Sequence, residues 1–219
     1  MIRGAIFDLD GVLLDSLGIW YDLGARYILS MGMQPVPGMS ETLFSMSMEQ
    51  GAAYLKRTFG LEKSEEEIIA DLEQILRDYY CKEVPAKEGA KELLAFLQEQ
   101  GVKMAAATSS PRPHVTEALN RLGLLSYMQE IYTTGEVGES KHSPRIYELA
   151  AQSLECSAEE ILVFEDSLYA LKTAKTAGFR CVGVYDAQGE SDQQGLKMTA
   201  DLYLHKLIEF SAIWDELQK

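Results

Sequence analysis

Two aspartates lie two residues apart near the start of the chain, directly after a short apolar run. The run is Ala5-Ile6-Phe7, and the segment that follows it reads Asp8-Leu9-Asp10-Gly11-Val12. Side chains two apart on an extended segment share a face, so the carboxylates of Asp8 and Asp10 can converge on one point. Two close carboxylates repel each other, and a hard cation such as Mg²⁺ relieves that repulsion. The simpler alternative is a solvated acidic turn, because Asp and Gly are both common turn residues.

Three further polar segments come later, each at the end of a predicted strand or in a loop beyond one. Thr108-Ser109-Ser110 follows an apolar run over 102–107, and its hydroxyls suit phosphate oxygens. Lys141 lies in a loop before a predicted helix and offers a mobile point charge for phosphate. Phe164-Glu165-Asp166-Ser167 closes another apolar run, and its acids could complete a metal site. Taken singly, these segments are also explained as helix caps or solvated surface groups. Taken together, they favour a phosphate and metal site.

The elements that must position these residues alternate along the chain after Val84-Pro85. Helices are predicted over 87–100, 113–122, 144–154 and 168–177, with a short one near Ile213. Strands are predicted over 5–7, 102–107, 130–133, 161–164, 181–184 and 202–204. Such alternation indicates an α/β fold, a Rossmann-like parallel sheet with helices on both faces.

The segment 15–82 has a helical pattern and no convincing strand. Two capping boxes, Ser47 with Gln50 and Ser64 with Glu67, each predict the start of a helix. The stretch 33–40 contains two prolines and a glycine and is predicted as a loop. An insertion placed just after the first strand is expected to act as a helical cap on a site at the carboxyl ends of the strands.

Length and composition are consistent with this arrangement and limit the partners. The 219 residues can form an α/β core from residues 1–14 and 83–219, with 15–82 as the inserted cap. A net charge of −14 argues against nucleic acid and membrane partners, but not against a small phosphorylated metabolite. Three cysteines without a C-x-x-C pair fit free thiols in a reducing cytoplasm. No run approaches the roughly 18 apolar residues of a membrane span. We therefore expect a soluble cytoplasmic protein, with no indication of its oligomeric state.

Acid pair, hydroxyl, lysine and second acid pair, in that order, resemble the haloacid dehalogenase-like (HAD) phosphohydrolases. The likeness is to the branch that includes β-phosphoglucomutase and phosphoglycolate phosphatase, and it covers nearly the whole chain. It implies a Mg²⁺-dependent phosphatase that hydrolyses a small phosphorylated metabolite through an aspartyl-phosphate. In this resemblance Asp8 is the nucleophile, and Asp10 protonates the leaving oxygen and then activates water. The phosphoryl oxygens are held by three side chains: Thr108, Ser109 and Lys141.

The same resemblance implies where the cation binds. Mg²⁺ would lie between Asp8, the Asp10 carbonyl and Asp166, with Glu165 as a water-mediated partner behind them. The physical chemistry agrees, since phosphoryl transfer needs positioning and the neutralisation of spread negative charge.

Several positions depart from the family pattern. The lysine motif usually runs Lys-Pro-x-Pro, whereas here His142 follows the lysine as a loop substitution that could touch substrate. The helix after the second acid pair carries Ala170 where a glycine is usual. Spacing puts Trp20 and Met48 where the mutase has a cap histidine and a phosphate-binding arginine, and only Arg112 is a nearby substitute for that charge.

These departures favour hydrolysis over phosphomutase chemistry of the β-phosphoglucomutase type, which stays the alternative. A phospho-accepting signalling receiver domain also gathers acids, a hydroxyl and a lysine on an α/β fold. Receiver domains are much shorter and have no helical insertion, so this alternative is remote.

Overall fold

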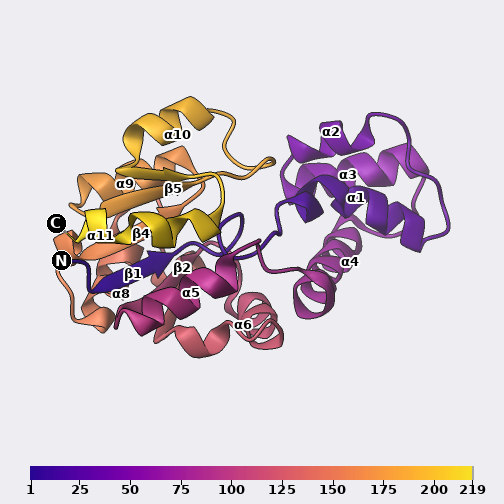
Figure 1. Ribbon diagram of the computed structural model, residues 1–219. Coiled ribbons are helices and arrows are strands. Elements are labelled where there is room, and N and C mark those ends of the chain that lie inside the picture. Colours follow the sequence, from indigo (N-terminus) through magenta and orange to yellow (C-terminus); the bar gives the residue numbers. More distant parts are fainter. Residues whose placement is uncertain (219) are drawn as a thin grey trace. The chain divides into compact units, whose positions relative to one another are not determined.

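The computed structural model describes residues 1–218 and divides the chain into two compact units (Figure 1). One unit combines Met1–Ser16 with the chain from Val84 onwards, and the other is Leu17–Glu83. The sequence predicts that the first segment of the first unit ends at residue 14, and the structure extends it to Ser16. The reason is local bonding: the Asp15 N–H donates to the Pro85 carbonyl at 3.0 Å, and the Ser16 hydroxyl donates to Asp10 at 2.5 Å.

The first unit contains a six-stranded, fully parallel sheet. Its strands are β1 (Gly4–Phe7), β2 (Lys103–Thr108), β3 (Glu130–Thr133), β4 (Ile161–Glu165), β5 (Arg180–Val184) and β6 (Leu202–Leu204). They lie in the order β3-β2-β1-β4-β5-β6, which is the Rossmann order. All six strands were predicted, each within one residue at either end, because buried parallel strands form short, nearly continuous apolar runs.

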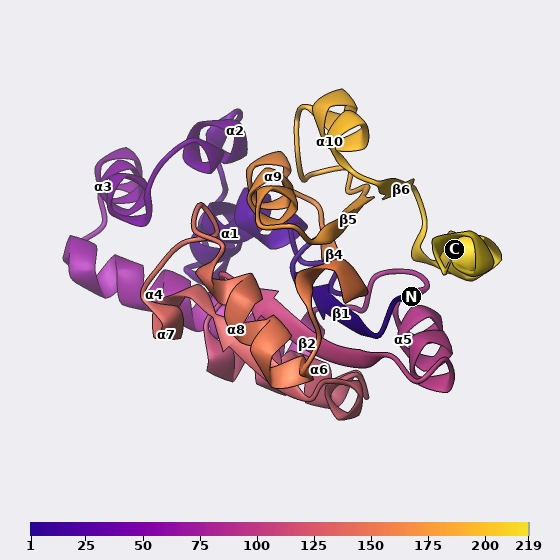
Figure 2. The same ribbon diagram turned by 90° about the vertical axis from the view of Figure 1, so that its left-hand side faces the viewer.

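Helices cover both faces of this sheet. They are α5 (Ala90–Glu99), α6 (Arg112–Arg121), α7 (Thr134–Val137), α8 (Arg145–Leu154), α9 (Leu168–Thr176), α10 (Gln193–Thr199) and α11 (Trp214–Leu217). Figure 2 shows α8 and α9 on one side of the sheet and α5 with α11 on the other. The short helices α7 and α10 were not predicted, since so few residues show no reliable periodicity.

Each face of the sheet has its own apolar core. Against α8 and α9, the sheet buries alternate strand residues such as Ile6 and Val163. On the opposite face Phe7 stacks on Phe164 at 4.5 Å, and Phe210 packs against Phe164 at 5.4 Å. Side chains alternate between the two faces along β1, so Ile6 packs in one core and Phe7 in the other. Asp8 comes next, at the carboxyl end of the strand.

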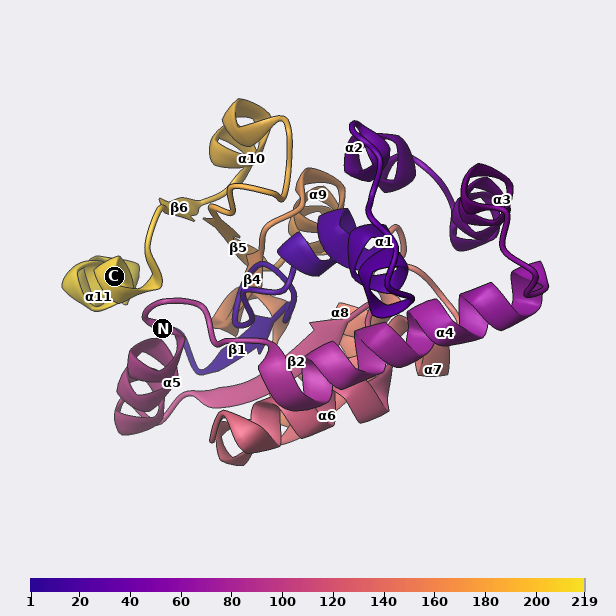
Figure 3. The same cartoon turned by 90° about the vertical axis from the view of Figure 1, so that its right-hand side faces the viewer.

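The second unit is entirely helical among its described elements. It contains α1 (Gly18–Ser30), α2 (Met39–Phe44), α3 (Met48–Phe59) and α4 (Glu65–Asp78), and a short π-helix over Tyr79–Glu83 follows α4 (Figure 3). Both predicted capping boxes are present: the side chains of Ser47 and Ser64 accept from the backbone of Gln50 and Glu67, which bond back. The predicted loop over 33–40 was wrong at its end, because α2 begins at the buried Met39 directly after Gly38, whose φ is +75°. Within residues 1–218, the helices lack the combination of length and apolar character that a membrane span requires.

Candidate active site

The predicted site residues of the α/β unit meet at one edge of the sheet. Phe7 pairs in register with Ala106 of β2 and Phe164 of β4, and the Asp8 N–H donates to the Phe164 carbonyl at 2.9 Å. Parallel strands that share a register end together, so the residues that follow β1, β2 and β4 gather at their carboxyl ends. In open α/β sheets this is the edge where ligands bind.

A buried lysine bridges the two acidic motifs. The ammonium Nζ of Lys141 lies 2.7 Å from Oδ1 of Asp8 and 2.7 Å from Oε1 of Glu165. The Tyr147 hydroxyl donates to the same Glu165 oxygen at 2.8 Å. Burial alone would lower the pKa of Lys141, but the charges of Asp8 and Glu165 outweigh it and raise that pKa, so the lysine stays charged.

Negative charge in this cluster exceeds what Lys141 can offset. Carboxylate oxygens of Asp8, Glu165 and Asp166 all lie within 4.8 Å of one another. Burial raises the pKa of Asp8 well above its ordinary value, and burial followed by the charge of Glu165 raises the pKa of Asp166 to about 7. A cluster of oxygen donors with this charge excess fits a hard divalent cation such as Mg²⁺.

Asp10 has different partners from the three clustered acids. Its two carboxylate oxygens accept hydrogen bonds from the hydroxyls of Ser16, at 2.5 Å, and Ser110, at 2.6 Å. Gly11 follows with a φ of +77°, a left-handed conformation that turns the chain sharply after Asp10. These contacts hold the Asp10 carboxylate in one orientation.

The hydroxyl segment after β2 turns tightly at the same edge. Thr108 is fully buried, and its Oγ1 accepts the Ser110 N–H at 3.0 Å, whereas Ser109 is exposed. Thr108 and Ser109 therefore lie where phosphate binding was expected. Ser110 belongs to the predicted hydroxyl segment, but its hydrogen bond to Asp10 was not predicted.

A second, partly buried ion pair lies next to the cluster and was missed as well. Nζ of Lys87 donates to the Gly11 carbonyl and to Oδ2 of Asp186, the latter at 2.8 Å. Asp186 follows β5, so the rule that found the other strand-end residues would have found it. Lys87 has no such signal, because only the folded chain brings it to Gly11, 76 residues away in sequence.

Two of the predicted accessory residues have specific partners. The guanidinium of Arg112 forms a fork with Glu136, at 2.6 and 2.8 Å, and reaches Glu130 at 3.3 Å. Arg112 is thus already paired, and the expectation that it supplies free charge for a second phosphate has no support in this geometry. His142 is exposed, and its ring lies 4.5 Å from that of Tyr169.

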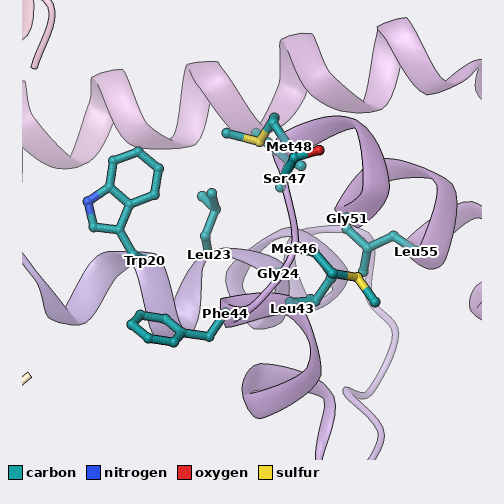
Figure 4. Close-up of a pocket in the computed structure, with 11 residues that line it drawn as sticks. Trp20, Leu23, Gly24, Leu43, Phe44, Met46, Ser47, Met48, Gly51 and Leu55 are labelled. Atoms are coloured by element: carbon teal, nitrogen blue, oxygen red, sulfur yellow. The ribbon is translucent and has the colours of Figure 1, made fainter. Parts of the chain in front are cut away.

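Trp20 lies in the helical unit, where it lines a cavity of about 280 Å³. Figure 4 shows Trp20 and Leu23 on α1 and Met48 at the start of α3, with the thioether of Met48 directed back towards them. The complete lining is Trp20, Leu23, Gly24, Leu43, Phe44, Met46, Ser47, Met48, Gly51, Leu55 and Leu72. None of these residues carries a charge, so the cavity is suited to apolar groups.

A sheet in the Rossmann order, with clustered acids and a buried lysine at its carboxyl edge, is typical of α/β enzymes that bind small ligands there. Comparison with known sequences defines the family. The pattern of the haloacid dehalogenase-like hydrolases matches residues 5–184, and the chain belongs to this family.

Its relatives include proteins that are named as phosphatases. The chain is 28% identical over 184 residues to the phosphorylated carbohydrates phosphatase of Thermotoga maritima, covering 84% of this chain and 85% of that protein. It is 31% identical over 191 residues to the phosphoglycolate phosphatase of Pectobacterium atrosepticum, covering 84% and 80%. The crystal structure of a β-phosphoglucomutase-like protein from Thermotoga maritima superposes with a TM-score of 0.86 at 26% identity, covering 98% of this chain and 99% of the other.

Proposed function

We propose that this protein is a Mg²⁺-dependent phosphatase that hydrolyses a small phosphorylated metabolite through an aspartyl-phosphate on Asp8. The observation that carries the proposal is the bridge formed by Lys141, which binds Asp8 at 2.7 Å within a cluster of three buried acids. The relatives support the reaction class, since those named above as phosphatases act on phosphorylated carbohydrates and phosphoglycolate.

In this mechanism the residues divide the work of phosphoryl transfer. The Asp8 carboxylate attacks phosphorus, and the P–O bond to the organic alcohol breaks. Asp10, held by two hydroxyls, donates a proton to the leaving oxygen and then takes one from the water that cleaves the acyl phosphate. Thr108, Ser109 and the Lys141 ammonium bind the phosphoryl oxygens. Mg²⁺ held by Asp8, the Asp10 carbonyl and Asp166 would neutralise part of the charge on the phosphoryl group.

Two features favour hydrolysis over the phosphomutase alternative. A mutase must hold a doubly phosphorylated intermediate while this intermediate reorients in the site, which requires a second set of cationic donors. Arg112 is engaged by Glu136 and Glu130, and Trp20 and Met48 line an uncharged cavity. We therefore propose that the helical unit serves as a cap that selects the organic part of the substrate and does not hold a second phosphate.

Asp8→Asn tests the nucleophile. An amide cannot attack phosphorus, so release of inorganic phosphate from monophosphates should fall by about 10³-fold or more. The variant should still fold, since Lys141 keeps its ion pair with Glu165 at 2.7 Å and the new amide has nearly the shape of the carboxylate. Asp215→Asn, on an exposed residue, is the matched control.

Two measurements decide the outcome. Acid-quenched wild-type enzyme should yield a phosphorylated peptide that contains Asp8, and the Asp8→Asn variant should not. Retention of most activity in that variant, with the same requirement for Mg²⁺, would exclude Asp8 as the nucleophile.

Phosphorus NMR with β-glucose 1-phosphate separates hydrolysis from phosphomutase chemistry: rapid isomerisation with little phosphate release would refute hydrolysis.

A further inference from the structure

The buried Lys141 lies on a tight turn between α7 and α8, and the exposed His142 follows it directly. The turn spans residues 140–143, where the N–H of Ser143 donates to the carbonyl of Ser140 at 3.0 Å. Lys141 is 2% exposed, whereas the His142 side chain lies at the surface. Loops are more mobile than the elements that they connect, so the position of the lysine depends on what holds this turn.

Two consecutive side chains of the turn contact the same neighbouring segment, which is the end of β4 and the start of α9. Nζ of Lys141 lies 2.7 Å from Oε1 of Glu165, the last residue of β4. The ring centroids of His142 and Tyr169 are 4.5 Å apart, and the two ring planes form an angle of 32°. This is the separation of a packed aromatic pair. The turn is therefore joined to this segment by a buried ion pair and, one residue later, by a ring contact at the surface.

Tyr169 gives the ring contact a fixed support, because it belongs to α9. In this helix Leu171 and Ala174 are fully buried in the core on that face of the sheet. At the start of the helix the Leu168 N–H donates to Glu190 at 2.9 Å. A ring that is held by α9 can therefore restrain the turn that packs against it.

The ring of Tyr169 also lies at the border of the charge cluster. Tyr169 is 42% exposed, yet burial raises the pKa of its hydroxyl; the charge of Lys141 lowers that pKa and the charge of Glu165 raises it. The hydroxyl is thus near enough to the cluster for these charges to act on it. The contact with His142 therefore holds the turn on the side where the Lys141 ammonium enters the cluster.

We propose that His142 and Tyr169 form an aromatic clasp that positions the Lys141 ammonium for the phosphoryl group. His142 is a positioning residue, which acts through Lys141 and not by contact with the substrate. The inference rests on the proposed function and adds a pair of residues to it. Small displacements of a group that binds the reacting centre lower the rate, so a loosened turn should slow phosphoryl transfer.

His142→Ala tests the clasp, because it removes the ring and leaves Lys141 in place. With Mg²⁺ and p-nitrophenyl phosphate, kcat/KM should fall about three- to tenfold, the factor that corresponds to the energy of one aromatic pair. His142→Phe should return kcat/KM to within about twofold of the wild type, because it keeps a ring and removes the imidazole nitrogens.

His205→Ala is the matched control, and its kcat/KM should stay within about twofold of the wild type. His205 is also exposed, and its ring lies 5.2 Å from that of Tyr185. It follows β6, which forms the opposite edge of the sheet from β3. A loss in His142→Ala no larger than that in His205→Ala would overturn the clasp.

The two rings should act as a unit. Tyr169→Ala should lower kcat/KM by about as much as His142→Ala, and the double variant should be less than about twofold worse than either single variant. Losses that multiply would overturn the clasp. A His142→Phe variant as impaired as His142→Ala would overturn it too, because the imidazole nitrogens and not the ring contact would then matter.

A measurement on the free protein separates this inference from the proposed catalysis. The backbone amide order parameter of Lys141, from NMR relaxation, should be about 0.85 in the wild type and in His142→Phe, and below about 0.7 in His142→Ala. An unchanged order parameter in His142→Ala would overturn the clasp whatever the kinetics. Failure of the proposed function would appear instead as no phosphate release from any ester by the wild type, with the difference in order parameter intact.

Discussion

Lys141→Met is the most direct test of the buried charge cluster, because it removes one cation and nearly preserves the side-chain volume. Lys141 is 2% exposed, and its ammonium lies 2.7 Å from both Asp8 and Glu165. Removing one partner of a buried pair typically costs ~3–5 kcal/mol, because it leaves buried charge without compensation. We expect the free energy of unfolding in EDTA at pH 8 to fall by about that amount. The loss should be smaller at pH 5.5, where Asp8, whose pKa burial already raises, can take up a proton.

Urea unfolding followed by circular dichroism measures this free energy, with two further variants as controls. Lys172→Met changes an exposed lysine and should stay within about 0.5 kcal/mol of the wild type. Adding Glu165→Gln to Lys141→Met should recover at least about 1 kcal/mol, because it removes one of the two unpaired charges. A cost below about 1 kcal/mol for Lys141→Met, or no recovery in the double variant, would refute the argument that Lys141 compensates these acids.

Two more predictions concern the surroundings of the cluster. Mg²⁺ should raise the melting temperature more at pH 8 than at pH 6. The reason is that the pKa of Asp166 is raised to about 7, and below that pH a proton occupies the carboxylate that the cation needs. Scanning fluorimetry with and without EDTA measures the shift, and an equal or larger shift at pH 6 would contradict the prediction. Lys87→Met should lower kcat by roughly 10²-fold and change KM less than about twofold, because Lys87 holds the Gly11 carbonyl and Asp186 and so positions the turn after β1. Lys87→Arg should restore part of kcat, whereas a loss of stability with unchanged kcat would show that Lys87 acts on the fold alone.

The sequence predicted the sheet well because its strands are buried on both faces. A strand such as Ile161–Glu165 is a continuous apolar run that ends at a polar residue, and this pattern depends little on distant parts of the chain. The same property places Asp8, Thr108 and Asp166, which we propose as site residues, where a strand ends. The two capping boxes were equally local, because each is formed by residues three apart.

What the sequence did not predict depends on contacts between distant residues. The pairing of Lys87 with Gly11 and Asp186 joins three segments that no local pattern relates. Arg112 is a second example of a contact that the sequence does not reveal. Its position after the hydroxyl motif suggested a free cation, but the folded chain brings Glu136 within 2.6 Å of it. A charged residue near a site can therefore be located from the sequence, while its availability for a ligand depends on which side chains it meets.

Trp20 and Met48 illustrate why the choice of substrate is harder to predict than the chemistry. Phosphoryl transfer constrains a few charged groups at strand ends, and these have strong local signals. We propose that the helical unit selects the organic group, and the residues that line its cavity resemble ordinary helix packing in sequence. Only the volume left between these helices distinguishes a binding cavity from a packed core. Gly51 is an example: a Cβ there would lie 3.5 Å from Cδ2 of Leu43, an ordinary contact, and a glycine gives no sign in the sequence that it lines a cavity.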